Sequence, residues 1–233
     1  LSLRETIGEK EGIGSGKSMV FKKVLRNRKR FHSLLYIARK LQGPVTDGDR
    51  MIRHLPLFFS GLTKWRSLPS VAERSFRENF PEIRQDIKNY DKTAVFYAGC
   101  LNDFVYPEIG TDLVKLLNRI NVRVIFPEGQ NCCGVPALYS GDRETALKLA
   151  VQNVDAMLGD GADCIVTTCP TCTMALQRNF PELLKDDPVY YPKAIQLAEK
   201  TMDISGFISS QLVIVNGKKD IFSEIQETVT YHD

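Results

Sequence analysis

Three short apolar runs rich in β-branched residues constrain the fold of this chain more than any other feature. They read "TAVFYA" at residues 93–98, "VRVIF" at 122–126 and "CIVTT" at 164–168. Runs of this kind are typical of buried strands, and helical stretches at 104–119 and 143–158 separate them. The β-α-β-α-β order predicts an α/β fold, with a parallel, Rossmann-like sheet, right-handed crossovers and helices on both faces.

The sequence also predicts regular elements after this core. Residues 170–180 and 193–202 have helical patterns. Pro170 suits the first position of a helix, because the N–H that proline lacks would be unpaired there in any residue. Two further apolar runs, "LVIV" at 212–215 and "TVTY" at 228–231, predict additional strands.

The charge of the chain changes sign along its length. Residues 1–90 hold 19 Lys and Arg against 9 Asp and Glu, a balance of +10, whereas residues 91–233 hold 12 against 19, a balance of −7. All six cysteines lie in the acidic part. We therefore predict two parts, a basic helical linker or extension at 1–90 and a cysteine-rich module at 91–233.

A single amphipathic helix is predicted over residues 18–42, ending at Gly43 and Pro44. Between Lys17 and Lys40 the chain has nine basic residues and no acidic one. This positive face suits an acidic surface, either on the module of the same chain or on a redox partner. The rest of the basic part is expected to form short helices broken at Pro56, Gly61, Pro69 and Pro81.

The stretch "GIGSGKS" at residues 12–18 resembles a phosphate-binding loop only superficially. The motif requires a glycine five positions before Gly16, where this chain has Glu11, and it requires a preceding apolar strand, where this chain has "ETIGEKE". We therefore exclude a nucleotide-binding loop here.

Five of the six cysteines follow the predicted strands. Cys100 comes shortly after the first strand, the adjacent Cys132 and Cys133 lie in the loop after the second, and Cys169 and Cys172 come after the third. Because parallel strands end at one edge of the sheet, where open α/β folds bind their ligands, we expect all five thiols around one site.

The local sequence favours thiolates at this edge. A helix that starts at Pro170 places Cys169 at its cap and Cys172 in its first turn, beside unpaired backbone amides. Thiolates are the ligands that soft metals and iron–sulfur clusters require. Gly134 lets the backbone pass close to a bound group, and amides near Gly134 and Thr171 are expected to donate hydrogen bonds to sulfur.

Other chemistry fits some of these cysteines. The Cys169–Cys172 pair alone fits a dithiol redox motif as well as a metal site, but three further thiols favour a metal. Structural zinc takes four ligands, so a fifth thiolate favours a multi-iron centre and leaves zinc as the alternative. Cys164 lies inside a strand and is expected to be a small core residue. No ligand role is expected for the three histidines, His32, His54 and His232.

The cysteine spacing and the words "FYAGC", "NCCGVP" and "TTCPTC" resemble a known module over residues 91–233. It is the cysteine-rich CCG module of heterodisulfide reductase catalytic subunits and of the iron–sulfur subunits of glycolate, lactate and glycerol-3-phosphate dehydrogenases. Members of that family bind a 4Fe-4S centre, non-cubane in some, whereas others hold an ordinary cluster or zinc. The resemblance implies that the cluster ligands here are Cys100, Cys132, Cys133, Cys169 and Cys172.

The resemblance also implies a function. The chain would be an iron–sulfur electron-transfer unit, as a subunit or fragment of an oxidoreductase. That oxidoreductase would be either a 2-hydroxy-acid dehydrogenase or a heterodisulfide-reductase-like complex. The partner would be a flavoprotein or another redox subunit. Family members commonly carry two modules in tandem, so this module is expected to be the first of two in a longer chain. The alternative is a zinc-stabilised structural or docking module without redox activity.

The composition limits the other classes of partner. A basic face alone is weak support for nucleic-acid binding, which we do not expect. The sequence has no apolar run near 18 residues and no signal peptide. We therefore predict a cytoplasmic protein without membrane insertion. Any association with a membrane would depend on a partner protein. No catalytic residue is assigned from the sequence.

Overall fold

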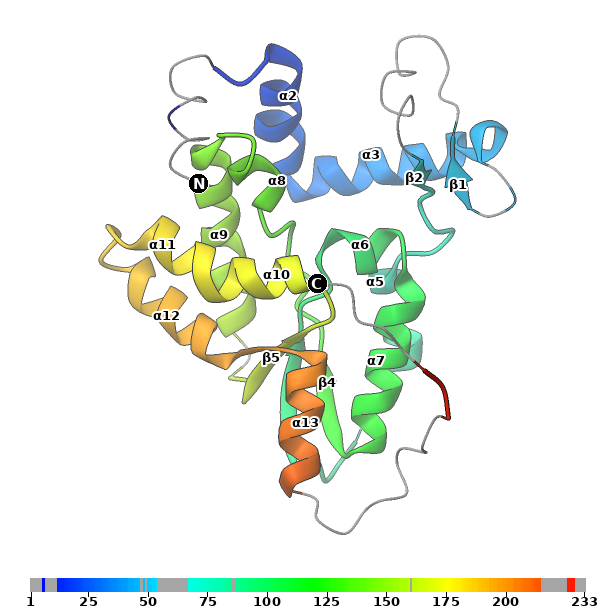
Figure 1. Ribbon diagram of the computed structural model, residues 1–233, viewed down its shortest axis with the longest axis vertical. Helices are drawn as coiled ribbons and strands as arrows, with labels where there is room; N and C mark the ends of the chain where they lie inside the picture. Colours follow the sequence, from blue (N-terminus) through cyan, green and yellow to red (C-terminus); the bar gives the residue numbers. More distant parts are fainter. Residues whose placement is uncertain are drawn as a thin grey trace.

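The computed structural model describes residues 6, 12–46, 48, 50–53, 67–84, 87–159, 161–214 and 226–228. Its centre is a four-stranded parallel sheet with the spatial order β4-β3-β5-β6 (Figure 1). The strands are β3 (Lys92–Phe96), β4 (Val122–Ile125), β5 (Cys164–Thr167) and β6 (Thr201–Asp203). The predicted α/β fold is therefore confirmed, and its first three strands lie where the apolar runs placed them.

Alternate side chains of β3 pack against helices on opposite faces of the sheet. Ala94 and Phe96 belong to one core cluster, and Val95 and Tyr97 to the other. The first cluster is covered by α5 (Phe76–Ile83), α7 (Pro107–Arg119) and α13 (Ile204–Ile214). The second is covered by α9 (Arg143–Leu158), α10 (Pro170–Met174), α11 (Phe180–Leu184) and α12 (Tyr190–Lys200). Helices thus cover both faces, as predicted.

The helix from Pro170 is longer than the sequence predicted. A π-helical segment, Ala175–Asn179, joins α10 to α11, so helical structure continues to Leu184. Two further short helices follow the strands: α6 (Gly99–Phe104) comes after β3, and α8 (Val135–Leu138) comes after the loop that follows β4.

The connections after β3 and β5 leave the sheet on opposite faces. β3 leads through α6 into α7 on one face, whereas the neighbouring β5 leads into α10 on the other. This is a topological switch point, where open α/β sheets form a crevice beyond the carboxyl ends of their strands.

The basic segment forms two helices rather than the predicted single one. Helix α2 (Ser15–Met19) continues into a π-helical segment, Val20–Leu25, and α3 (Arg28–Leu41) then starts in a new direction. Between them Asn27 is extended, and its side-chain oxygen accepts the N–H of Arg30 at 3.0 Å. The prediction missed this break because apolar spacing continued through a residue that caps the second helix. The predicted stop at Gly43 and Pro44 is confirmed by a 3₁₀ turn, Gly43–Val45.

The structure differs from the predicted short helices at Pro69 and Pro81. Pro69 lies in a short strand, β2 (Leu68–Pro69), which pairs antiparallel with β1 (Met51–Ile52). A strand with a single partner tolerates a proline, because the missing N–H can face away from the ladder. Pro81 lies inside α5, which ends two residues later at Ile83. Pro56 and Gly61 lie outside the described residues.

The last predicted elements also differ. α12 ends at Lys200, before the predicted end at residue 202, and the next three residues form β6. The predicted strand at 212–215 is wrong over residues 212–214, which belong to α13. A short apolar run fits a strand or a buried helix equally well by periodicity. Of the predicted strand at 228–231, only Thr228 is described, and it lies in no regular element.

The basic part packs directly on the sheet. Phe76 is fully buried, with its ring centroid 5.1 Å from that of Phe96 and 5.0 Å from that of Phe126. The predicted division of the chain near residue 91 stays a prediction. Among the described residues, no helix is both long and apolar enough to span a membrane.

Candidate metal centre

The five cysteines that follow the strands contact one another. Each thiol affects the pKa of the next, in the order Cys100, Cys132, Cys133, Cys172 and Cys169. Thiols from three separate loops thus meet at the carboxyl edge of the sheet. The contacts are pairwise, and within the described residues no three His, Cys, Asp or Glu side chains are arranged to hold one metal ion.

The sixth cysteine points elsewhere, as predicted. Cys164 packs in the core cluster on the α7 face, with Phe96 and Val166. Burial raises the pKa of its thiol to about 11. It therefore behaves as an apolar core residue and not as a sixth member of the thiol group.

The thiols differ in exposure. Cys132, Cys133 and Cys172 are buried, whereas Cys100 and Cys169, at the two ends of the contact chain, are partly exposed. A group bound here would therefore be held mostly inside the protein, with an approach from solvent at each end.

The thiols alternate in acidity along the contact chain. Interactions with Cys132 and Cys172 hold the pKa of Cys133 well below its usual range. The pKa of Cys132 is raised by Cys100 and then by Cys133, and the pKa of Cys172 is raised by Cys133 and then by Cys169. A hydrogen bond from Cys132 lowers the pKa of Cys100. A hydrogen bond from Cys172 lowers the pKa of Cys169 to about 6. The arrangement favours thiolates at alternate positions, the form in which cysteine binds metals.

Backbone amides also act on two of these sulfurs. The amide of Val135 helps to lower the pKa of Cys133, and the amides of Cys172 and Thr171 help to lower the pKa of Cys169. That amides near Gly134 and Thr171 would donate hydrogen bonds to a bound group's sulfur ligands stays a prediction. Such bonds stabilise negative charge on sulfur.

Two glycines allow the loops to approach so closely. Gly99 has φ +65°, and a Cβ atom there would lie 2.8 Å from Sγ of Cys172. Gly134 has φ +79°, and its Cβ would lie 3.3 Å from Cα of Ala146 on α9. Gly134 thus serves the packing of its loop on α9, whereas Gly99 leaves the space next to the thiols.

A network of buried amides, missed by the sequence reasoning, fixes the double-cysteine loop. The hydroxyl of Tyr97 donates to the carbonyl oxygen of Asn131 at 2.6 Å. Asn153 accepts the N–H of Asn131 at 2.8 Å and donates to the carbonyl oxygen of Cys132 at 2.9 Å. Gln130 binds the end of β3, accepting the N–H of Ala98 at 2.9 Å. The sequence feature that could have indicated this network is Asn153, a polar residue on the buried side of α9.

A buried ion pair holds the helix that carries Cys100. Asp103 on α6 is 1% exposed, and Nε of Arg77 on α5 lies 2.6 Å from its Oδ2. The backbone N–H of Arg77 donates to the other carboxylate oxygen at 3.1 Å. Burial raises the pKa of Asp103, although Arg77 acts in the opposite direction. The pair ties the basic part of the chain to the thiol site.

The basic segment also covers the thiols. Leu25 is buried in a cluster with Cys132, and Phe21, Phe31 and Cys100 pack against that cluster. The carbonyl oxygen of Leu25 accepts a hydrogen bond from the side chain of Asn131 at 3.3 Å. The segment therefore contributes apolar side chains that pack beside two of the thiols.

Some basic side chains of the N-terminal segment bind groups in the acidic part of the same chain, as expected. Arg26 pairs with Glu144 on α9 at 3.2 Å, and Arg28 donates to the carbonyl oxygen of Glu128.

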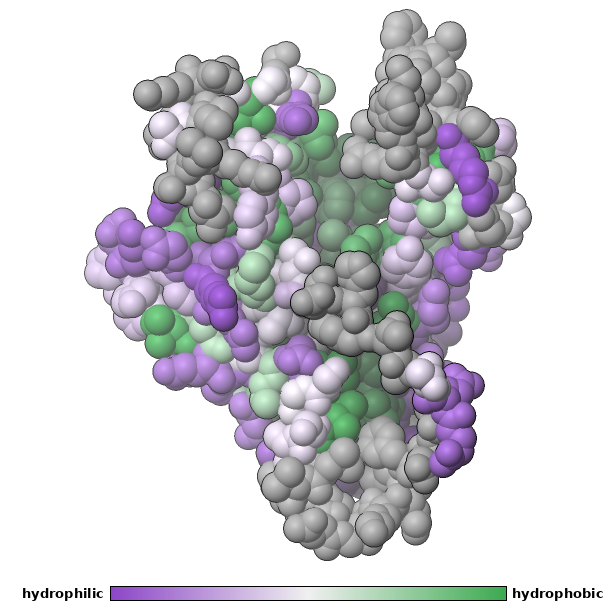
Figure 2. Space-filling model, viewed as in Figure 1, coloured by the Kyte–Doolittle hydropathy of each residue, from purple (hydrophilic) through white to green (hydrophobic). Residues whose placement is uncertain are grey.

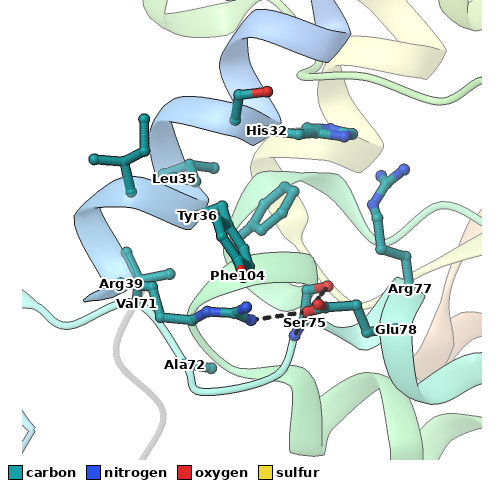
Figure 3. Close-up of a pocket in the computed structure, with 12 residues that line it drawn as sticks. His32, Leu35, Tyr36, Arg39, Val71, Ala72, Ser75, Arg77, Glu78 and Phe104 are labelled. Atoms are coloured by element: carbon teal, nitrogen blue, oxygen red, sulfur yellow. Dashed lines mark hydrogen bonds and ion pairs between the residues drawn. The ribbon is translucent and has the colours of Figure 1, made fainter. Parts of the chain in front are cut away.

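A cavity of about 440 Å³ lies beside the site, between α3 and the start of α5 (Figure 3). The aromatic side chains of His32, Tyr36 and Phe104 line it. The ring centroids of His32 and Phe104 lie 5.0 Å apart. Burial, together with the charges of Arg77 and Arg28, lowers the pKa of His32 to about 4, so this imidazole is neutral. His32, Arg77 and Phe104 also border a narrow gap that reaches Cys100 and Cys132.

The donor set fits an iron–sulfur group. Five neighbouring thiols, three of them buried, with backbone amides that lower the pKa of Cys133 and Cys169, match the chemistry that such a group requires. That these five residues are its ligands stays a prediction.

Comparisons with known proteins find a cysteine-rich domain in the same part of the chain. Residues 94–177 match the family model CCG, described as a cysteine-rich domain. The chain is 36% identical over 141 residues to "Lactate utilization protein A 2" of Bacillus cereus (strain 03BB102), covering 60% of this chain and 55% of that protein. It is also 36% identical over 141 residues to "Lactate utilization protein A" of Halalkalibacterium halodurans, covering 60% of this chain and 54% of that protein. The chain thus spans about half the length of these relatives. No solved structure matches it.

Proposed function

We propose that this chain, whose residues 94–177 match the family model CCG of a cysteine-rich domain, is an iron–sulfur electron-transfer unit in the oxidation of lactate or a similar 2-hydroxy acid. The observation that carries the proposal is the chain of five thiols at the switch point of the sheet. The names of the relatives support lactate over a disulfide as the substrate class.

The five thiols would hold a 4Fe-4S-type centre. The group would supply one-electron transfer when bound. The protein's part is to fix the ligands, with amides of Val135 and Thr171 stabilising negative sulfur and with Leu25 and Phe31 excluding water on the side of Cys132 and Cys100.

The cavity beside the site supports electron transfer over substrate binding. A 2-hydroxy acid carries a carboxylate, which proteins usually bind with an arginine fork. Both arginines that line the cavity already have carboxylate partners: Arg39 lies 3.0 Å from Glu78, and Arg77 is paired with Asp103. His32 is neutral there. The substrate would thus be bound by a partner, a flavoprotein or another redox subunit, and electrons would pass to the thiol site.

Anaerobic reconstitution tests the proposal. The protein should become brown and retain iron and acid-labile sulfide, with an electron paramagnetic resonance signal after oxidation or reduction. Cys133→Ser should lose most of the iron, because it removes the central thiolate of the contact chain. The matched control is Cys164→Ser, which changes a cysteine on the other face of the sheet and should keep the iron. A colourless protein with one equivalent of zinc would favour the structural alternative instead.

A further inference from the structure

Helix α3 has two different sides. Its inner side carries Phe31, which packs at the thiol site, and His32 and Leu35, which line the cavity. Its opposite side carries Leu34, Ile37 and Leu41, which are 48%, 49% and 70% exposed, and Ile37 also borders the cavity. Positions i, i+3 and i+7 lie on one stripe of a helix. None of the residues of α3 is buried.

Cations accompany this exposed stripe. Arg30 lies four residues before Leu34 and therefore in line with it, and Lys29 and Lys40 are exposed on its flank. We call Arg30, Leu34, Ile37 and Leu41 the outer face of α3. The same combination occurs just before it, where Met19 and Val20 are 56% and 47% exposed. The exposed lysines around those two residues are Lys17, Lys22 and Lys23.

The basic side chains of residues 12–46 fall into two groups. Those on the inner side bind their own chain: Arg26 pairs with Glu144, Arg28 with the carbonyl oxygen of Glu128, and Arg39 with Glu78. Residues 12–46 contain no Asp or Glu that could neutralise the outer ones. Within the described part of the chain, the outer cations Lys29 and Arg30 have no carboxylate partner, which leaves them available to an anionic surface.

A lipid surface satisfies both features of the outer face. An acidic protein would match the cations but would need a groove for each separate aliphatic side chain. A bilayer with anionic headgroups accepts scattered leucine and isoleucine side chains at its acyl boundary, while lysine and arginine extend to the phosphates. Figure 2 shows hydrophobic and hydrophilic residues next to each other over α2 in the upper part of the view. With 14 residues, α3 is too short to cross a bilayer and would lie along it.

We propose that the outer face of α3, together with the exposed residues of α2, docks this chain on an anionic lipid surface. The arrangement also orients the thiol site. The inner side of α3 contacts Phe104, at the end of the same helix α6 that carries Cys100. The site would then face the lipid across a single helix layer, roughly 10 Å thick.

Vesicle sedimentation with the full chain tests this proposal independently of any bound metal. Vesicles of phosphatidylcholine alone are compared with vesicles that contain about a third phosphatidylglycerol, at low and at high salt. We expect binding to the anionic vesicles, little to the neutral ones, and a strong loss with salt. Equal binding to both kinds, or binding to neither, contradicts the proposal.

Two pairs of variants separate lipid docking from simple charge attraction. Lys29→Gln/Arg30→Gln should weaken binding roughly tenfold, whereas Lys185→Gln/Lys193→Gln, the same charge change at exposed positions elsewhere, should not. Leu34→Ser/Leu41→Ser should weaken it by a similar factor, and the control Ile109→Ser/Val189→Ser, also exposed, should not. If the leucine variant binds normally while the charge variant fails, the surface fits any polyanion, including an acidic protein, and the lipid proposal is wrong. Circular dichroism checks that each variant is folded.

Discussion

Asn153 donates its side-chain amide to the carbonyl oxygen of Cys132 at 2.9 Å, across 21 positions of sequence. The same side chain accepts the N–H of Asn131 at 2.8 Å and donates to the carbonyl oxygen of Leu149. One fully buried amide on α9 thus fixes the loop that carries two of the five thiols. The position of these cysteines depends on a helix on one face of the sheet, and not only on the strand that precedes them.

Asn153→Ala should destabilise the protein and loosen the double-cysteine loop. The change leaves the N–H of Asn131 and the carbonyl oxygen of Cys132 buried without this partner, which costs about 2–4 kcal/mol. Urea unfolding measures the loss. Gln196→Ala, an exposed amide on α12, is the matched control and should change stability by less than about 0.5 kcal/mol. Equal effects of the two variants would show that the network contributes little.

Removing one member of the buried ion pair should be more costly than removing both. Asp103→Leu leaves the charge of Arg77 without its carboxylate in a mostly buried position, and Arg77→Met leaves the charge of Asp103 fully buried. We expect each single change to cost about 3–5 kcal/mol, and the double change to cost less than either single change. Chemical denaturation of the four proteins in this cycle gives the coupling. Additive losses would mean that the pair does not act as a unit.

The sequence predicted the part of the site that topology dictates. Once three parallel strands were recognised, Cys100, Cys133 and Cys172 had to follow their carboxyl ends, and Cys164, inside a strand, had to point into the core. Periodicity could not predict the ion pair between Arg77 and Asp103, because its members are 26 residues apart and neither belongs to a motif.

The elements that were wrongly predicted share a physical cause. At Asn27 a single side-chain cap starts a new helix inside a continuous apolar pattern. At residues 201–214 a three-residue strand pairs with β5 and is followed by an apolar helix, whose run "LVIV" fits a strand equally well. In both places a local pattern allowed two structures, and contacts with distant residues selected one.

The stability of the protein should fall as the pH drops from about 6.5 to about 4, in part because of His32. Burial, with Arg77 on α5 and Arg28 on α3 nearby, lowers its pKa in the folded state from 6.5 to about 4. Between these values the unfolded chain binds a proton that the folded chain does not, so the contribution of His32 is complete above pH 6.5 and is lost towards pH 4. His32→Gln should flatten the pH dependence of urea unfolding in this range. An unchanged slope would show that His32 does not contribute to it.

Gly99→Ala should disturb the thiol site beyond the ordinary cost of a side chain at positive φ. The residue has φ +65°, and the new Cβ would lie 2.8 Å from Sγ of Cys172, so the sulfur or α6 must move. Gly161→Ala is a matched control, because Gly161 has φ +62° but nothing within 4 Å of a new Cβ. Both variants should lose about 1 kcal/mol to backbone strain, and Gly99→Ala should lose more. Thiol titration of the metal-free protein should then find faster reaction of the buried cysteines in Gly99→Ala only. If the two variants are equally stable and their thiols react equally fast, the close approach of Gly99 to Cys172 does not shape the site.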